Sequence, residues 1–145
     1  MAIQPKVIAL GFFDGVHLGH GALLRRAAEE AALRGCTPAV FTFDRPPKEV
    51  VTGVPCPLIN SPEDRRDLVR RLYRIQDVLM VPFDREMMTT PWDDFIVRIL
   101  VGRYHAVHLV AGHDHHFGHR NQGTPELLAQ KCAQLGLGCD IIPKV

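Results

Sequence analysis

The segment from Val7 to His20 combines residue types that could bind and transfer a phosphate group. An apolar run, Val7–Leu10, leads into a stretch that contains Gly11, Gly15 and two histidines. Glycine has no Cβ, so the backbone at these positions can approach a ligand closely. A strand, a turn and a helix start in this order also direct backbone N–H groups and the positive end of the helix dipole toward one pocket. The sequence therefore predicts a phosphate site where this strand ends.

The two histidines, His17 and His20, have the spacing and chemistry for a catalytic pair. Residues three apart at the start of a helix project to the same side. Imidazolium donates two hydrogen bonds and titrates near neutral pH, which suits the negative charge that builds up on a phosphate in its transition state. The segment supplies no nucleophile, and none is needed if the second substrate brings a phosphate oxygen. The alternative is that both histidines only line a helix start, and Asp14 is equally open to a role as a turn residue.

Three segments carry a resemblance to a known family. Gly11–His20 resembles the Gly-x-Phe-Asp-Gly-x-His-x-Gly-His signature of the nucleotidyltransferase superfamily, in the form found in bacterial FAD synthetases. Phe41–Val50 is similar to the Thr-Phe-x-Pro-x-Pro segment of that family, and Val110–Gly123 is similar to its Val-Gly-x-Asp/Asn-Phe-x-Phe-Gly-x-x-x-x-Gly segment. The three segments follow the order of the family and span nearly the whole chain.

The resemblance implies adenylyl transfer from ATP to FMN, giving FAD and pyrophosphate, with His17 and His20 as the catalytic residues. It implies nucleotide binding by Gly11, Phe12, Phe13, Asp14, Gly15, His17 and His20. It implies flavin binding by Pro46, Pro47, Asp114, Phe117 and Gly118. Mg²⁺ would accompany ATP, held mostly by phosphates and water, and Asp114 is a candidate protein ligand by its position.

The sequence also departs from the family pattern. Phe12 stands where the family has Asn, Arg45 displaces the first proline of the second segment, and His115 replaces an aromatic residue near the flavin. A Ser-Ser-Thr-x-x-Arg element that grips the ATP phosphates in the family should follow Val145, and the riboflavin kinase domain of the family is absent from these residues. Either the chain stops short of a longer protein, or it binds triphosphate in another way.

These departures leave two further functions open. Phe12 and His115 lie where ligand identity should be read, which would suit cytidylyl or adenylyl transfer to another small phosphorylated alcohol. The missing phosphate-binding element would suit a nucleotide- or flavin-binding module without catalysis. A separate possibility concerns the histidine-rich run from His113 to His119, which contains imidazoles and one carboxylate and could hold a transition metal if the loop folded for it.

Composition limits the remaining classes. A chain of 145 residues with 46% hydrophobic residues is enough for one domain, so residues 1–145 are expected to form a single nucleotidyltransferase domain. The net charge of +1 argues against a nucleic-acid partner. Apolar runs fall far short of the ~20 residues that span a bilayer, and no secretory signal is present, so a cytoplasmic protein without a membrane partner is expected. Cys36, Cys56, Cys132 and Cys139 have neither disulfide nor zinc spacing and should be reduced.

The elements that would position these residues alternate between strand and helix. Strands are predicted at residues 6–10, 37–43, 77–81, 106–111 and 139–142, and helices at 17–34, from Ser61 onward, at 91–102 and at 124–135. Residues 51–60 read as a loop, and the helix after Ser61 should turn its arginines outward with Leu68, Val69 and Leu72 inward. The fold class is therefore α/β, a Rossmann-like parallel sheet with helices on both faces. Ligands in such sheets bind beyond the carboxyl ends of the strands.

Overall fold

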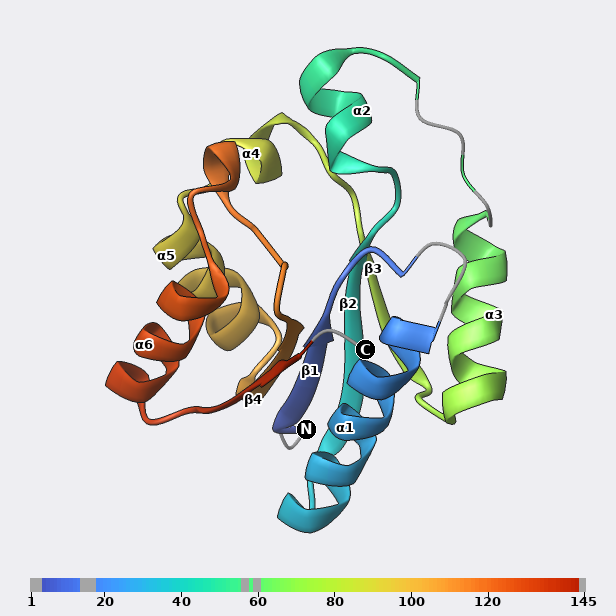
Figure 1. Cartoon of the computed structure of the whole chain (residues 1–145), viewed down its shortest axis with the longest axis vertical. Coiled ribbons are helices and arrows are strands. Elements are labelled where there is room, and N and C mark those ends of the chain that lie inside the picture. Colours follow the sequence, from blue (N-terminus) through green and yellow to red (C-terminus); the bar gives the residue numbers. More distant parts are fainter. Residues whose placement is uncertain (1–3, 14–17, 56–57, 59–60, 144–145) are drawn as a thin grey trace.

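The computed structural model describes residues 4–13, 18–55, 58 and 61–143. Figure 1 shows one sheet with helices on either side of it. The strands are β1 (Lys6–Leu10), β2 (Thr37–Phe43), β3 (Asp77–Val81), β4 (Ala106–Gly112) and β5 (Gly138–Ile142). The helices are α1 (Leu18–Arg34), α2 (Pro47–Thr52), α3 (Pro62–Tyr73), α4 (Arg85–Met88), α5 (Trp92–Asp94), the π-helix η1 (Phe95–Arg103), the 3₁₀ turn η2 (His119–Asn121) and α6 (Pro125–Leu135).

The sheet has five strands in the order β3-β2-β1-β4-β5, and every neighbouring pair is parallel. The predicted fold class is confirmed. From β1 the chain runs outward to β2 and β3, and then returns to the other side of β1 to form β4 and β5. The order therefore reverses between β1 and β4, and ligands of open parallel sheets bind in the crevice at such a point.

Alternation along β1 divides the core into two layers. Val7 and Ala9 pack under α1 and α3, whereas Ile8 and Leu10 pack against η1 and α6 on the opposite face. All four side chains are at most 2% exposed. A central parallel strand is buried on both faces, which explains why β1 reads as an uninterrupted apolar run instead of an alternating one.

Local capping sets the helix boundaries as the sequence predicts. The Ser61 hydroxyl accepts a hydrogen bond from the backbone N–H of Asp64 at 3.1 Å and caps α3. Thr124 caps α6 in the same way, through the N–H of Leu127 at 3.2 Å. Gly136 ends α6 with a φ of +73°, a left-handed conformation that glycine adopts without a Cβ clash.

Three short helices differ from the sequence prediction. α2 was not predicted; it takes in the residues before the expected loop at 51–60 and the first two residues of that loop, and it begins at Pro47 because Pro46 is extended and proline suits a first helical turn. α4 was not predicted, and its only local signal is the Asp84 carboxylate, which accepts from the N–H of Met87 at 2.9 Å. The predicted helix at 91–102 is present as α5 followed by η1.

Two predictions about α3 are wrong. Arg65 is 1% exposed and packs toward the sheet, although all arginines of this helix were expected to face outward. Leu72 is 59% exposed, although it was expected to face the core. Leu72 lies seven residues after Arg65, on the same side of the helix as Arg65 and Val69. Its exposure therefore reflects its place in the last turn of α3 and not the side of the helix on which it lies.

Candidate functional site

A cavity of about 210 Å³ lies at the carboxyl ends of β1 and β2. Its lining is mainly aromatic and apolar, and the polar groups come from the segment after β4. The lining residues are Leu10, Gly11, Phe12, Phe41, Phe43, Pro47, Phe83, Met87, Phe95, His115, His116, Phe117, Gly118 and Asn121. Concave apolar sites with a few polar groups are typical of small-molecule binding.

The aromatic walls of the cavity support one another edge to face. The ring of Phe41 lies 5.4 Å from the rings of both Phe43 and Phe95, with interplanar angles near perpendicular. Phe43 in turn lies 4.8 Å from Phe83. Edge-to-face pairs at these distances are favourable and restrict ring motion. The cavity is therefore lined by rings that pack against one another.

The segment after β4 reaches the cavity through a tight turn at Gly118. The backbone of Phe117 and Gly123 exchanges two hydrogen bonds, at 3.2 and 2.8 Å. Gly118 has a φ of +78°, and a Cβ there would lie 2.6 Å from Cα of Trp92. His119 N–H donates to the Thr90 carbonyl at 2.8 Å. Glycine is thus required for this segment to pack against the start of α5.

His115 contributes a neutral imidazole to the wall. Its ring is stacked on Phe117, with centroids 5.8 Å apart and an interplanar angle of 16°. Burial lowers the pKa of His115 from 6.5 to about 4, and the nearby Asp114 carboxylate offsets this only in part. At neutral pH the ring is uncharged, with one nitrogen that donates and one that accepts.

The turn after β1 is shaped by Phe13. Phe13 has a φ of +60° and its side chain is 1% exposed, packed in the layer under α1. Its ring lies 5.0 Å from the ring of His20 at an angle of 78°, and a Cβ at Gly11 would come within 2.7 Å of it. The need for glycine at position 11 thus arises from this ring within the protein. Phe13 supports His20 from below and does not line the cavity.

The structure brings together part of the predicted site. Gly11, Phe12, Pro47, Phe117 and Gly118 line one cavity. His20, at the start of α1, is half-buried, and Pro46 and the exposed Asp114 flank the cavity segments without lining it. Three predicted residues, Asp14, Gly15 and His17, lie outside the described residues.

Two site residues were missed by the sequence analysis. Arg65 donates to the carbonyl oxygens of Phe12 and Phe43, both at 2.9 Å, from beneath the cavity wall. The carboxylate of Asp44 accepts from the N–H of Phe83 at 3.0 Å and joins the ends of β2 and β3. The spacing of four between Arg65 and Val69 is the signal that could have placed Arg65 on the buried stripe. No comparable pattern marks Asp44.

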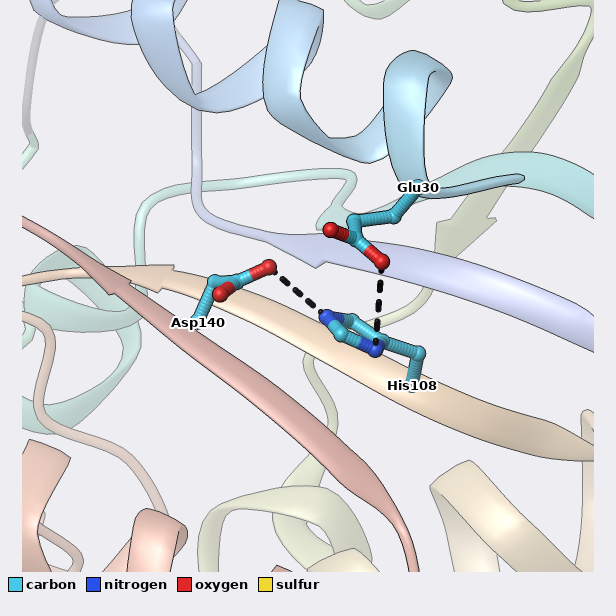
Figure 2. Close-up of side chains that lie close together, drawn as sticks. All are labelled: Glu30, His108 and Asp140. Atoms are coloured by element: carbon cyan, nitrogen blue, oxygen red, sulfur yellow. Dashed lines mark hydrogen bonds and ion pairs between the residues drawn. The ribbon is translucent and has the colours of Figure 1, made fainter. Parts of the chain in front are cut away.

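A metal centre is not supported at the predicted loop. Within the described parts of the chain, the one group of converging ligand atoms is Glu30, His108 and Asp140, and the histidines of 113–119 form none. Figure 2 shows His108 between the two carboxylates. Its Nε2 lies 2.8 Å from Asp140, whereas the other ring nitrogen, Nδ1, lies 4.0 Å from Glu30. Each carboxylate therefore lies near a different nitrogen of the His108 ring.

Arginines already neutralise these carboxylates. Arg26 lies 3.1 Å from Asp140 and 3.2 Å from Glu30, and Arg34 lies 3.3 Å from Glu30. A cation entering this group would meet two guanidinium groups and a ring that cannot turn both nitrogens to it. The group is therefore an ion-pair network that ties α1 to β4 and β5.

Comparison with known proteins decides the family. The family model described as FAD synthetase matches residues 1–145, which is the whole chain. The chain belongs to the FAD synthetase family. The resemblance seen in the three sequence segments is confirmed.

Curated relatives of this FAD synthetase-family chain share about a third of its residues. A protein named bifunctional riboflavin kinase/FMN adenylyltransferase from Listeria monocytogenes is 34% identical over 127 residues, covering 86% of this chain and 40% of that protein. The proteins of the same name from Escherichia coli strain K12 and Bacillus subtilis are 35% and 31% identical, covering 93% and 97% of this chain but 42% and 44% of their own lengths. The chain therefore spans less than half the length of these relatives.

A solved structure shares the fold. The crystal structure titled as a macrolide-efflux protein from Streptococcus pneumoniae matches with a TM-score of 0.83 at 25% identity, covering 100% of this chain and 47% of that one. Among the helices of the described residues, none has the length and apolar character needed to cross a bilayer.

Proposed function

We propose that this domain transfers the adenylyl group of ATP to the phosphate of FMN, forming FAD and releasing pyrophosphate. The observation that carries the proposal is the aromatic cavity at the carboxyl ends of β1 and β2, whose lining includes Gly11 and Phe12 beside Phe13, the residue that contacts His20. Membership of the FAD synthetase family supports the same assignment. Phosphate and planar ring would then be bound by adjacent parts of one crevice.

The lining of the cavity suits an isoalloxazine ring. A planar heteroaromatic ring gains from stacking on aromatic side chains, and Phe43, Phe83 and Phe117 supply such faces and edges. His115 is neutral at physiological pH, because burial lowers its pKa to about 4. It can therefore offer a hydrogen bond to a carbonyl or ring nitrogen of the flavin without bringing a charge into an apolar slot. Pro46 and Pro47 would border the same ring from the start of α2.

The transfer itself requires positioning and charge stabilisation. An FMN phosphate oxygen attacks the α-phosphorus of ATP, a P–O bond forms there, and the bond from the α-phosphorus to the bridging oxygen breaks as pyrophosphate leaves. The protein needs no nucleophile. His17 and His20 would donate hydrogen bonds to the oxygens that gain charge. Mg²⁺ would arrive with ATP, and the exposed carboxylate of Asp114 suits a metal that keeps most of its waters.

A substrate screen tests the proposal. The protein is incubated with ATP and FMN, and separately with CTP and a small phosphorylated alcohol, while pyrophosphate release and FAD fluorescence are followed. We expect pyrophosphate and FAD in equal amounts from the first mixture only. Turnover of CTP with the alcohol alone would replace the proposal by the other transferase reaction. FMN binding without any pyrophosphate release would replace it by a binding module.

A further inference from the structure

Arg65 is a buried cation whose guanidinium donates hydrogen bonds to groups at the candidate site. It comes from the first turn of α3, is 1% exposed, and donates through Nη1 to Phe12 O at 2.9 Å, Thr42 Oγ1 at 3.0 Å and Phe43 O at 2.9 Å. Nη2 lies 3.5 Å from the carbonyl of Asp44. One guanidinium therefore binds the segments that leave β1 and β2.

The same guanidinium covers the ring of Phe12. Its Cζ lies 4.2 Å from the Phe12 ring centroid, within the range of a cation–π contact. Phe12 and Phe43 both line the cavity. The charge thus fixes the backbone and one side chain of the wall together. Burying a charged group is costly without such contacts. The presence of a buried arginine here therefore indicates a structural role in the cavity wall.

We propose that Arg65 is a positioning residue of the site: it holds the carboxyl ends of β1 and β2 in register, and so sets the aromatic wall and the backbone up to Phe13, whose ring contacts that of His20. Arginine suits this task because its planar fork donates in several fixed directions, whereas lysine is a single point donor. Nη1 donates to Thr42 and Phe43 at the end of β2 and to Phe12 just after β1, while Nη2 faces the Asp44 carbonyl. The link from this residue to turnover rests on the proposed function, while its link to the backbone does not.

Residue-resolved amide exchange tests the positioning directly. The N–H of Gly11 donates to Phe41 O at 3.3 Å, and the N–H of Asp44 donates to Val81 O at 3.0 Å. Both amides flank the carbonyls that Arg65 holds. In Arg65→Met we expect exchange at Gly11 and Asp44 to rise at least about tenfold, in keeping with the loss of hydrogen bonds to a charged group. Exchange in α1 and β4 should stay within about twofold.

Two variants complete the design. Arg65→Lys keeps the charge and should restore part of the protection, because one donor remains. Arg71→Met removes an exposed arginine of the same helix and should leave both amides unchanged. A uniform rise in exchange across the sheet, or an unchanged pattern in Arg65→Met, would overturn the proposal. If Arg65→Met does not fold, the exchange pattern of Arg65→Lys decides the question. A uniform rise in exchange across the sheet of Arg65→Lys would then overturn the proposed positioning role.

Activity provides the second readout. With FMN and ATP saturating, turnover in Arg65→Lys should fall at least about tenfold relative to wild type, while Arg71→Met matches wild type. If Arg65→Lys loses amide protection at Gly11 and Asp44 but keeps wild-type turnover, the proposed role of Arg65 in the site is overturned. Absence of turnover in the wild-type protein would instead count against the proposed function, and the exchange result would still decide the role of Arg65 in the backbone.

Discussion

The hydroxyl of Thr42 donates a 2.7 Å hydrogen bond to the carbonyl oxygen of Phe12. Thr42 lies in β2 and is 2% exposed, and Phe12 follows the end of β1. The same hydroxyl oxygen accepts from Arg65 at 3.0 Å. A buried hydroxyl thus joins two neighbouring strands at the edge of the sheet where the cavity opens.

Removal of the Thr42 hydroxyl should lower the free energy of unfolding even when the side chain keeps its shape. Thr42→Val leaves the Phe12 carbonyl with fewer donors in a buried place, so the free energy of unfolding should fall by about 1–3 kcal/mol. Thr42→Ser keeps the hydroxyl and should lose less, about 1 kcal/mol for the missing methyl group. Urea unfolding of both variants measures the difference. A Thr42→Val protein as stable as wild type would show that the hydroxyl bond contributes nothing.

Gly118 and Gly136 form a matched pair for backbone strain. Both have positive φ, +78° and +73°, but a Cβ at Gly118 meets Trp92 at 2.6 Å, whereas a Cβ at Gly136 meets nothing within 4 Å. Gly136→Ala should cost about 1 kcal/mol for the left-handed conformation alone. Gly118→Ala should cost about 2–4 kcal/mol, because a φ of +78° with a ψ of 180° is a conformation almost restricted to glycine and because the Cβ would also clash with Trp92. Thermal unfolding compares them, and similar shifts in Tm would contradict the packing described.

The elements of the sheet could be predicted from sequence, because their signals are local. The apolar run of β1 and the capping residues Ser61 and Thr124 set boundaries that the structure keeps. One reason for glycine at position 11 could not be predicted: a Cβ there would meet the ring of Phe13, whereas the sequence suggested only close approach to a ligand. That contact depends on the left-handed φ of Phe13, which no neighbouring residue signals.

Part of the site could also be predicted, because it depends on where the strands end. The segments that meet at the cavity all follow strands, and parallel strands bring such segments to one edge. Arg65 was missed because α3 carries several arginines, and only its spacing from Val69 separates the buried one from the exposed ones. Its partners are backbone carbonyls of Phe12 and Phe43, which any sequence would offer.

The pKa of His115 predicts a pH dependence of stability. Burial lowers this pKa from 6.5 to about 4 in the folded protein. Between these values the unfolded chain binds a proton that the folded protein does not, so stability falls as pH falls from 6.5 toward 4. His115→Phe lacks this group and should lose less stability over that interval. Urea unfolding at stepped pH tests this, and parallel curves for the two proteins would contradict it.

Asp140 predicts a second pH effect at lower pH. Burial raises the pKa of Asp140, but the hydrogen bonds from Arg26 and His108 outweigh it, so the pKa lies below its usual 3.8. The carboxylate therefore stabilises the fold above that value, and this contribution is lost as pH falls through the lowered pKa. Asp140→Asn should cost about 1–2 kcal/mol at pH 7.

The exposed Asp67 supplies the control for this variant. Asp67→Asn should leave the free energy of unfolding unchanged within about 0.5 kcal/mol. At low pH, where the wild-type carboxyl of Asp140 becomes protonated, the gap between wild type and Asp140→Asn should narrow. A gap that stays constant down to the acid transition would argue against the ion pairs with Arg26 and His108.

The role of His20 in the transfer is tested by the rate of FAD formation in His20→Ala. This rate is measured with FMN and ATP saturating, and FMN affinity is followed by flavin fluorescence. His20 packs against the ring of Phe13 and is not among the residues that line the cavity, so the variant should bind FMN as wild type does. We predict that its rate falls at least about 100-fold, as for the loss of one donor to a transition state. A wild-type rate in this variant would contradict the account.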